Sequence, residues 1–337
     1  MTQAIMTKFE NIKNMIGNTP LLEFTLRYKG KQMVVYAKAE YMNLSGSIKD
    51  RVAYYIMKKA YENKTISPDD IVCEATSGNT GIAFSAMASY LGHKAVIYMP
   101  DWMSKERISL MESFGAEVRL ISKEEGGFLG SIDRTNELAK QGGVFLPGQF
   151  TNEDNCDAHF FSTGVEIVEQ LKSIGKVADA VVAGVGTGGT VMGIGRRLKE
   201  ANPDCIMYPL EPVNSPTLST GYKVGSHCIQ GISDEFIPPI LKLEECGEVI
   251  SVDDIDSVIM AQRISKELGI GVGISSGANL LGAVVANAKL GGDKTVVTVF
   301  ADDNKKYLST HYSKHFEYAD DSISRDVELI SVKAIKA

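Results

Sequence analysis

The sequence has few cysteines and histidines, and it has no apolar run long enough to cross a membrane. Its five cysteines and five histidines are scattered without CxxC or metal-ligand spacing, so we predict reduced thiols and no metal site. A membrane span needs about 20 consecutive apolar residues, which are missing. Residues 1–14 also lack the apolar segment of a secretory signal. We therefore expect a cytoplasmic protein without membrane contacts.

An excess of basic residues is missing as well. The chain has 35 Lys and Arg against 42 Asp and Glu, a net charge of −7, and no basic stripe. This balance argues against nucleic acid as a partner. With 44% hydrophobic and 23% charged residues, the composition is that of a soluble globular protein, and the length of 337 residues suits two domains.

Glycine, in contrast, is abundant, and its 32 copies recur between apolar segments. A strand is predicted over 71–74, a Gly-rich turn over 75–81, a helix over 82–91 and a second strand over 95–99. An amphipathic helix is predicted next, over 104–114, because its apolar residues fall on one face.

The same order of elements occurs once more, and a third unit repeats its turn, helix and strand. A strand is predicted over 180–183, a Gly-rich turn over 184–190, then a helix and a strand over 205–210. The third unit runs from a turn over 269–277 through a helix to a strand over 295–300. Strand, turn, helix and strand form the unit of a parallel sheet. We therefore predict an α/β protein whose two domains face each other across a cleft.

The second turn contains Gly184-x-Gly186-x-x-Gly189, the spacing of a dinucleotide-binding loop. Glycines free the backbone N–H groups, and a helix N-terminus adds partial positive charge, so such a turn can bind any phosphate. A dinucleotide site also expects an acidic residue about 20 positions later. The candidate, Glu211, lies later than that and directly before Pro212. Phosphate binding is favoured; NAD binding and a simple packing turn are the alternatives.

Lys49 stands at the predicted start of a helix. Ser47 is a good N-cap, so Lys49 falls in the first turn, where a cation opposes the helix dipole. This field and partial burial would lower the pKa of the amine toward that of a usable nucleophile and base. Taken alone, however, a lysine is more often a solvated surface residue.

The third signal is the run Thr76-Ser77-Gly78-Asn79-Thr80. Hydroxyls, an amide and free N–H groups at the start of a helix can form a nest for a carboxylate. An ordinary N-cap turn is the alternative interpretation of the same residues.

Taken together, these segments resemble one known family. The motifs lie at 43–51, 76–81, 186–190 and 273–277, in the order found in the fold type II enzymes that depend on pyridoxal 5′-phosphate (PLP). Within them, the chain is similar to cysteine synthase and cystathionine β-synthase, and also to the hydrogen-sulfide-producing cysteine (hydroxyl) lyases. The resemblance runs from Ile16 to Thr310, nearly the whole chain.

The resemblance implies two three-layer α/β domains with twisted, mostly parallel sheets and PLP in the cleft between them. We expect a larger phosphate-cup domain over 1–44 and 153–315, and a smaller substrate-carboxylate domain over 45–152, with the seam near 148–155. Residues 316–337 are expected to form a charged, irregular C-terminal tail. The family also implies a homodimer and a small amino acid as substrate.

It also implies roles for individual residues. Lys49 matches the Schiff-base lysine, which then removes the α-proton as general base. Asn79 matches the residue that bonds the PLP ring hydroxyl, and Ser275 the serine that faces the pyridine nitrogen. The expected phosphate cup consists of Gly186, Thr187, Gly188, Gly189 and Thr190. The expected grip on the substrate carboxylate consists of Thr76, Ser77, Thr80 and Gln149.

One segment departs from the synthases. They have Gly-Ile-Gly-Ala-Gly-Phe where this chain has Gly-Ile-Ser-Asp-Glu-Phe, residues 231–236. An extra carboxylate at Asp234 would repel anionic sulfide and could take a proton from water. Our hypothesis is that L-cysteine loses sulfide through an α-aminoacrylate and gains water to give L-serine, with Asp234 as a catalytic residue. The alternative is that Asp234 only caps the turn before Pro238.

Other readings stay open. Cysteine synthase or cystathionine β-synthase-type replacement on O-acetylserine or serine is the main alternative. A serine or threonine dehydratase is a further possibility within the same fold. More distant are an NAD-dependent dehydrogenase, which has no role for Lys49, and a catalytically silent relative, which the presence of Lys49 with Asn79, Gln149 and Ser275 argues against.

Overall fold

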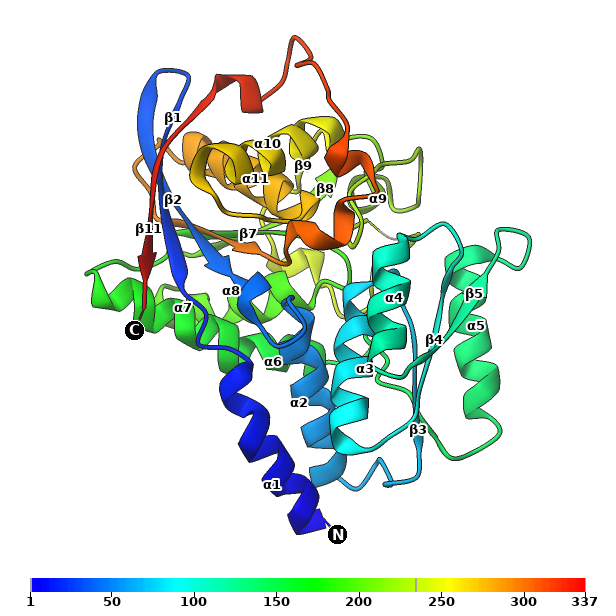
Figure 1. Ribbon diagram of the computed structural model, residues 1–337. Helices are drawn as coiled ribbons and strands as arrows, with labels where there is room; N and C mark the ends of the chain where they lie inside the picture. Colours follow the sequence, from blue (N-terminus) through cyan, green and yellow to red (C-terminus); the bar gives the residue numbers. More distant parts are fainter. Residues whose placement is uncertain (1, 234, 337) are drawn as a thin grey trace.

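The computed structural model describes residues 2–233 and 235–336, which form two β-sheets with helices on both faces of each (Figure 1). The larger sheet has the strand order β11-β1-β2-β10-β7-β8-β9. β1 runs antiparallel to both β2 and β11, and the other neighbours are parallel. The strands are β1 (Leu21–Tyr28), β2 (Lys31–Ala39), β7 (Ala180–Gly184), β8 (Ile206–Pro212), β9 (Ile250–Val252), β10 (Val296–Phe300) and β11 (Val327–Ile335).

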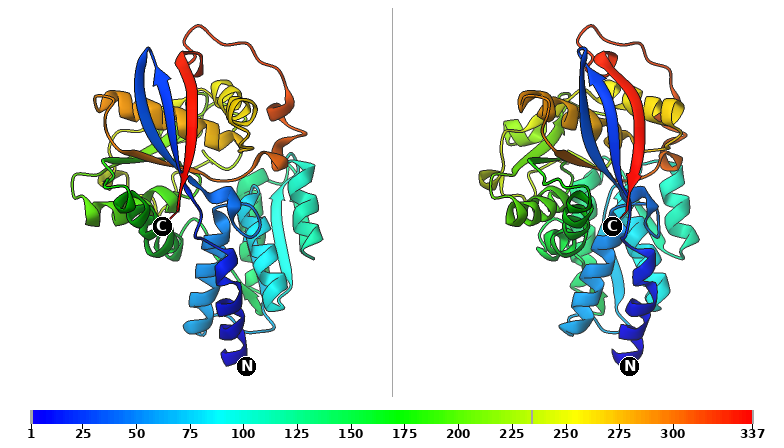
Figure 2. Two further views of the ribbon diagram at one scale, coloured as in Figure 1. Left: turned by 60° about the vertical axis from the view of Figure 1, so that its left-hand side comes forward. Right: turned by 90° about the vertical axis from the view of Figure 1, so that its left-hand side faces the viewer.

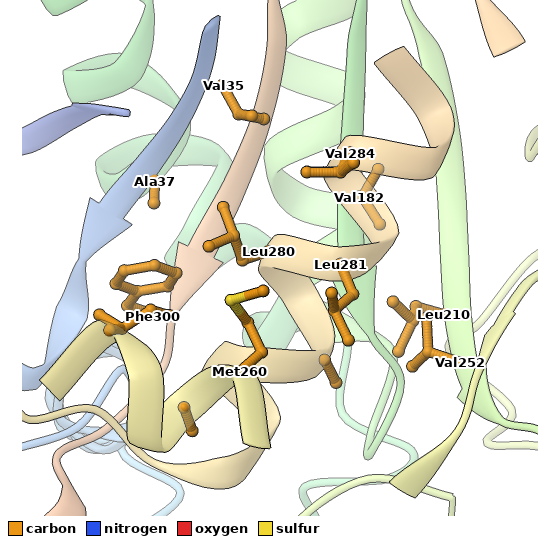
Figure 3. Close-up of a cluster of buried hydrophobic side chains, with 14 of the residues drawn as sticks. Val35, Ala37, Val182, Leu210, Val252, Met260, Leu280, Leu281, Val284 and Phe300 are labelled. Atoms are coloured by element: carbon orange, nitrogen blue, oxygen red, sulfur yellow. The ribbon is translucent and has the colours of Figure 1, made fainter. Parts of the chain in front are cut away.

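Helices cover both faces of this sheet because its central strands are apolar on both sides. Val182 of β7 packs with Met260 and Leu281, which belong to the two helices on one face (Figure 3). Its neighbour Val181 packs on the opposite face with Val191. This alternation is the period of two expected for a strand. The helices are α10 (Asp254–Leu268) and α11 (Ile274–Lys289) on the first face, and α7 (Gly164–Ser173) and α8 (Gly189–Ala201) on the second.

The smaller sheet is entirely parallel, with the order β5-β4-β3-β6. Ile97 faces a core shared with the helices on one side, and its neighbour Val96 faces the opposite side. The strands are β3 (Ile71–Ala75), β4 (Ala95–Pro100), β5 (Glu117–Ile121) and β6 (Val144–Phe145). The helices are α2 (Lys49–Glu62), α3 (Asn79–Leu91), α4 (Lys105–Ser113) and α5 (Gly127–Ala139).

The predicted α/β class is thus confirmed, as are the two strand–turn–helix–strand units, β3–α3–β4 and β7–α8–β8, and the turn–helix–strand unit α11–β10. Each sheet with its two helical layers forms a three-layer unit. Two shorter helices, α6 (Asp154–Ala158) and α9 (Thr217–Thr220), and a π-helical turn over His159–Thr163 complete the connections near the cleft. No helix within the described residues is long and apolar enough to span a lipid bilayer.

The two ends of the chain differ from the sequence prediction. We assigned residues 1–44 to the larger domain, and β1 and β2 do belong to its sheet. Helix α1 (Thr2–Ile12), however, buries Phe9 in the core of the smaller sheet with Ile56, because its apolar face fits α2. Residues 316–337 were predicted to form an irregular tail, but Val327–Ile335 form β11, which pairs with the open edge of β1 as the edge strand of the larger sheet (Figure 2).

Candidate active site

A cleft lies between the two sheets, at the carboxyl ends of parallel strands, where α/β proteins place their ligand sites. Its volume is about 780 Å³, counting the space that opens to solvent. Most of the predicted site residues line it: Lys49, Thr76, Ser77, Asn79, Thr80, Gln149, Gly186, Thr187, Gly188, Thr190 and Ser275. Gly189 is the first residue of α8 and is buried. Asp234 lies outside the described residues.

Lys49 is the first residue of α2, so its predicted place in a first helical turn is confirmed. The N-cap is Ile48 and not Ser47 as predicted, although the Ser47 hydroxyl still accepts the Lys49 backbone N–H at 3.2 Å. Ile48 in turn donates its N–H to the carbonyl of Ala301 at 2.8 Å, which ties the start of α2 to the segment after β10. The Lys49 backbone is therefore fixed by contacts on both sides of the cleft.

A buried ionic cluster anchors the same turn of α2. Arg51 bonds Glu40 at 2.6 Å and Glu166 at 2.7 Å, and Lys38 bonds Glu166 at 2.7 Å. Burial alone would raise the pKa of Glu40, but the charge and hydrogen bonds of Arg51 lower it to about 2. Since all four charges are paired, the cluster holds α2 against β2 and α7 without a buried excess charge.

The turn after β7 has the shape of a phosphate cup. Gly188 has φ +88° and is the N-cap of α8, a conformation that favours glycine. A Cβ at Gly186 would collide with the carbonyl oxygen of Gly231, so only glycine fits there. Asn155, fully buried, donates hydrogen bonds to Thr187 Oγ1 at 2.9 Å and to the carbonyl of Gln149 at 2.8 Å. The cup therefore has a rigid wall.

The loop after β3 also has the predicted character. Gly78 donates its N–H to Thr76 Oγ1 at 3.0 Å, which curls the loop at the N-terminus of α3. Gln149 accepts the Thr80 hydroxyl at 2.6 Å and donates one amide hydrogen to Ala75 at 2.9 Å. Since an amide carries two donor hydrogens, one remains for a carboxylate ligand.

Glu74, near the end of β3, holds the start of this loop and Gln149 by hydrogen bonds to their backbone. It is 6% exposed, and its carboxylate accepts backbone N–H groups of Ala75 at 3.0 Å and Gln149 at 3.2 Å. Burial raises the pKa of Glu74 to about 7, against the opposing effect of these hydrogen bonds. Glu74 therefore titrates near neutral pH directly under the proposed carboxylate grip.

His159 lies beneath the cup in the π-helical turn. It is fully buried between Thr163 Oγ1, at 2.9 Å, and Thr190 Oγ1, at 3.4 Å. Burial and, second, the positive charge of Lys49 hold the pKa of His159 well below its usual range. A neutral His159 therefore adds no positive charge near Lys49.

The position of Glu211 argues against the alternative that the turn after β7 binds a dinucleotide. That side chain is 1% exposed, and its carboxylate accepts the backbone N–H of Leu218 at 2.7 Å and the hydroxyl of Ser219. Both oxygens thus hold α9 in place, and Glu211 is not available to a ribose.

Three residues of the site were not assigned a role from the sequence: Asn155, Asp302 and Arg107. Asn155 and Asp302 are 0% exposed, and Arg107 is 1% exposed. Asp302 accepts the Asn79 amide at 2.8 Å and the Tyr307 hydroxyl at 2.7 Å. These three residues belong to no hydrophobic period and to no recognised motif, so nothing in the sequence assigned them to the site. Only the three-dimensional structure shows that they lie near the cleft.

The residues present fit PLP. Asn79 Oδ1 and Asn155 Oδ1 are buried and have no hydrogen-bond partner, so the cleft and its cup contain acceptors that a ligand can use. The Gly-rich turn at a helix N-terminus suits a phosphate, and the Lys49 amine suits an aldehyde carbon. A neutral hydroxyl at Ser275 on the cleft wall matches a pyridine nitrogen that carries no proton.

Comparisons with known proteins point the same way. Residues 12–302 match the family model described as pyridoxal-phosphate dependent enzyme. A probable cysteine synthase from Bacillus subtilis is 43% identical over 301 residues, which cover 89% of this chain and 96% of the relative.

Two crystal structures are more similar still. A hydrogen sulfide-producing enzyme from Fusobacterium nucleatum is 53% identical, with a TM-score of 0.96 over 98% of this chain and 100% of that chain. An Asp-to-Asn variant of that enzyme, in complex with an α-aminoacrylate intermediate, has a TM-score of 0.95 over 97% and 99% of the two chains.

Proposed function

Because this chain belongs to the pyridoxal-phosphate-dependent enzymes of the cysteine synthase type, we propose that it converts L-cysteine and water into L-serine and hydrogen sulfide. An enzyme of this type acts as a carbon–sulfur lyase or synthase. The observation that carries the proposal is the Ser233-Asp234-Glu235 segment. It follows directly on Gly231 and Ile232, which line the cleft, and it is acidic where the synthases are uncharged.

PLP, when bound, supplies an electron sink for the negative charge that develops at the substrate α-carbon. Lys49 is proposed to hold the cofactor covalently and then to take the α-proton on its released amine. The cup residues Gly186 to Thr190 hold the phosphate. Ser275, as a neutral partner, would leave the ring nitrogen without a proton, so the ring would withdraw electrons less strongly. Weaker withdrawal is sufficient for elimination, because the departing sulfur carries the electrons away.

The proposed steps balance in atoms and charge. Lys49 Nζ takes the proton from Cα while the Cβ–S bond breaks, and the sulfur leaves as HS⁻ with its own thiol proton. Water then adds its oxygen to the substrate Cβ while Asp234 accepts one of its protons, which passes to the released HS⁻ to give hydrogen sulfide. Lys49 returns a proton to Cα, and L-serine is released. The net change exchanges SH for OH with no oxidant or reductant.

The role of Asp234 rests on chemistry and on its neighbours. Gly231 has φ +94° and Ser233 has φ +54°, so the segment turns sharply at the cleft wall. Ser233 is held by hydrogen bonds of 2.7 Å from its N–H to Val185 and from its hydroxyl to Ser215. An Asp-to-Asn variant of the Fusobacterium enzyme in complex with α-aminoacrylate fits a reaction in which an aspartate acts after elimination.

A second candidate is cysteine synthesis from O-acetylserine and sulfide. It is favoured by the names of the curated relatives, which include cysteine synthases at 41–43% identity. The same Lys49, cup and carboxylate grip would serve this reaction. It differs in the leaving group and in the nucleophile, so the residues around Asp234 decide between the two. A homodimer remains a prediction from the family resemblance.

The experiment compares the wild type with Asp234→Asn and, as a matched control, Glu235→Gln. Glu235 pairs with Lys223 at 3.2 Å and lies one residue away. With L-cysteine, the wild type and Glu235→Gln should release sulfide and serine in equal amounts over many turnovers. Asp234→Asn should release about one sulfide per active site, accumulate α-aminoacrylate and form serine slowly. Unaltered serine formation by Asp234→Asn would contradict the proposal.

A further inference from the structure

Arg107, in the first turn of α4, is a buried cation at the wall of the cleft. Its side chain is 1% exposed, and its guanidinium stacks 4.6 Å from the centre of the Tyr307 ring. In Figure 1 the segment after β10, drawn in orange, lies beside α4. Ser104 Oγ donates to the carbonyl of Lys306 at 3.1 Å and joins these two parts of the chain. Arg107 is thus enclosed between the small sheet's helices and the larger domain.

Within the part of the chain that the structure describes, no carboxylate forms an ion pair with Arg107. Its Nε is buried without a hydrogen-bond partner, and its NH1 group donates a long hydrogen bond of 3.4 Å to Ser104 Oγ. Asp302 Oδ2, beyond the Tyr307 ring, already accepts the Tyr307 hydroxyl and the Asn79 amide. Burying an uncompensated charge costs several kcal/mol. Among the described residues, the neighbouring Glu106 carboxylate bonds Ser309 and does not pair directly with Arg107.

The loop after β3 lies directly against this cation. A Cβ at Gly78 would collide with Nε and Cδ of Arg107, so glycine is required and the guanidinium touches the loop backbone. The same loop lines the cleft with Thr76, Ser77 and Thr80, and Arg107 lines it as well. The N-terminus of α3, at Asn79, adds its partial positive charge at this point.

We propose that Arg107 is a positioning residue for substrate recognition: its charge, set against Gly78 at the cleft wall, makes the site selective for amino acids with a free α-carboxylate. From this place the cation stabilises a carboxylate seated in the Thr76–Thr80 nest and polarises the N–H groups that bind it. In a low-dielectric site this attraction is much stronger than in water. The inference rests on the proposed PLP site, and it holds for elimination and replacement alike.

The test uses two probes that lack a β-leaving group. L-Alanine carries the carboxylate, and L-alaninamide carries a neutral amide in its place. Their dissociation constants are measured by titrating the visible absorbance of PLP-loaded protein. The variants are Arg107→Met and Arg107→Gln, which remove the charge, and Arg107→Lys, which keeps it. Arg134→Met, which removes an exposed arginine paired with Glu137, is the control.

We expect Arg107→Met to raise the dissociation constant of L-alanine by about 10- to 100-fold, the range for losing a charged partner in a buried site. The dissociation constant of L-alaninamide should change by less than about threefold. Arg107→Lys should retain most of the wild-type affinity for L-alanine. KM for L-cysteine should rise more than kcat falls. Equal weakening of both probes, or no effect on L-alanine, would overturn the proposal.

Failure of a variant to fold and failure of the proposed reaction can both be distinguished from failure of the role of Arg107. If Arg107→Met fails to fold, Arg107→Gln against Arg107→Lys gives the same contrast between a neutral and a charged side chain. If the wild type binds L-alanine but forms no serine from L-cysteine, the proposed reaction fails while the role of Arg107 is still tested by the two probes.

Discussion

Asn79 Nδ2 donates a hydrogen bond of 2.8 Å to Oδ2 of Asp302, and the two residues lie 223 positions apart in the chain. The bond joins the first residue of α3 to the segment that follows β10. An ionised carboxylate can only accept, so the amide nitrogen must face Asp302. The amide oxygen, which is buried and has no partner, is therefore the atom left for a ligand.

Replacing Asp302 should loosen this arrangement. Asp302→Ala leaves the Tyr307 hydroxyl and the Asn79 amide without an acceptor, so we expect a loss of about 1–3 kcal/mol in the free energy of unfolding. The affinity for PLP should fall as well, because Asn79 can then rotate. Tyr307→Phe removes only one donor and should cost less. Urea unfolding and PLP titration measure both effects; unchanged values in Asp302→Ala would contradict the role of Asp302.

The covalent role of Lys49 gives a direct chemical prediction. After borohydride reduction, the wild-type protein should carry PLP on the peptide that contains Lys49, and dialysis should not remove it. Lys49→Ala should bind PLP reversibly and lack the modified peptide. Lys59→Ala, a change of a half-buried lysine in the same helix, is the matched control and should behave as the wild type. Mass spectrometry of the peptides decides the point, and a modified peptide elsewhere in the chain would refute the assignment.

The buried cluster at α2 should be sensitive to the loss of one charge. Glu40→Gln leaves the Arg51 guanidinium, 3% exposed, with a single carboxylate partner. Breaking a buried pair in this way typically costs about 3–5 kcal/mol. Glu10→Gln removes an exposed pair with Lys13, which solvent screens, and should cost far less than Glu40→Gln. Urea unfolding of both variants at neutral pH measures the difference in the free energy of unfolding. A similar decrease in the two variants would contradict the claim that the buried cluster stabilises the fold.

Glu74 makes stability depend on pH. Its pKa in the folded protein is raised to about 7, above the ordinary value of 4.5, so the folded state binds more protons between these values. Its contribution is fully present below pH 4.5 and is lost as the pH rises through 7. In Glu74→Gln this decline should disappear. Urea unfolding between pH 5 and 8 tests the prediction, and the same slope in both proteins would rule out Glu74 as its source.

Much of the fold could be predicted from the sequence, because the Gly-rich turns interrupt strongly apolar segments. The α/β class, the three turn–helix–strand units and the family resemblance are confirmed. The edge strand β11 could not be predicted, since it alternates only weakly and its partner β1 lies about 300 residues earlier. The packing of α1 on α2 depends on the shape of a surface far along the chain.

The site could be predicted where residues form compact motifs, as at 76–80 and 186–190. It could not be predicted where single residues act from a distance. Asp302 and Arg107 are charged residues in ordinary contexts, and only burial against Asn79 and Gly78 gives them a role. The assumed N-cap at Ser47 was wrong by one residue, because the hydroxyl bonds the Lys49 N–H while Ile48 already has helical dihedral angles.

The central claim is that water replaces the sulfur of L-cysteine. The most direct measurement incubates the PLP-loaded protein with L-cysteine in water labelled with oxygen-18, and follows sulfide release and the mass of the amino-acid product. We predict one sulfide for each L-serine formed, with the label in the serine side chain. Pyruvate and ammonia in place of serine, or turnover only when O-acetylserine and sulfide are supplied, would contradict the account.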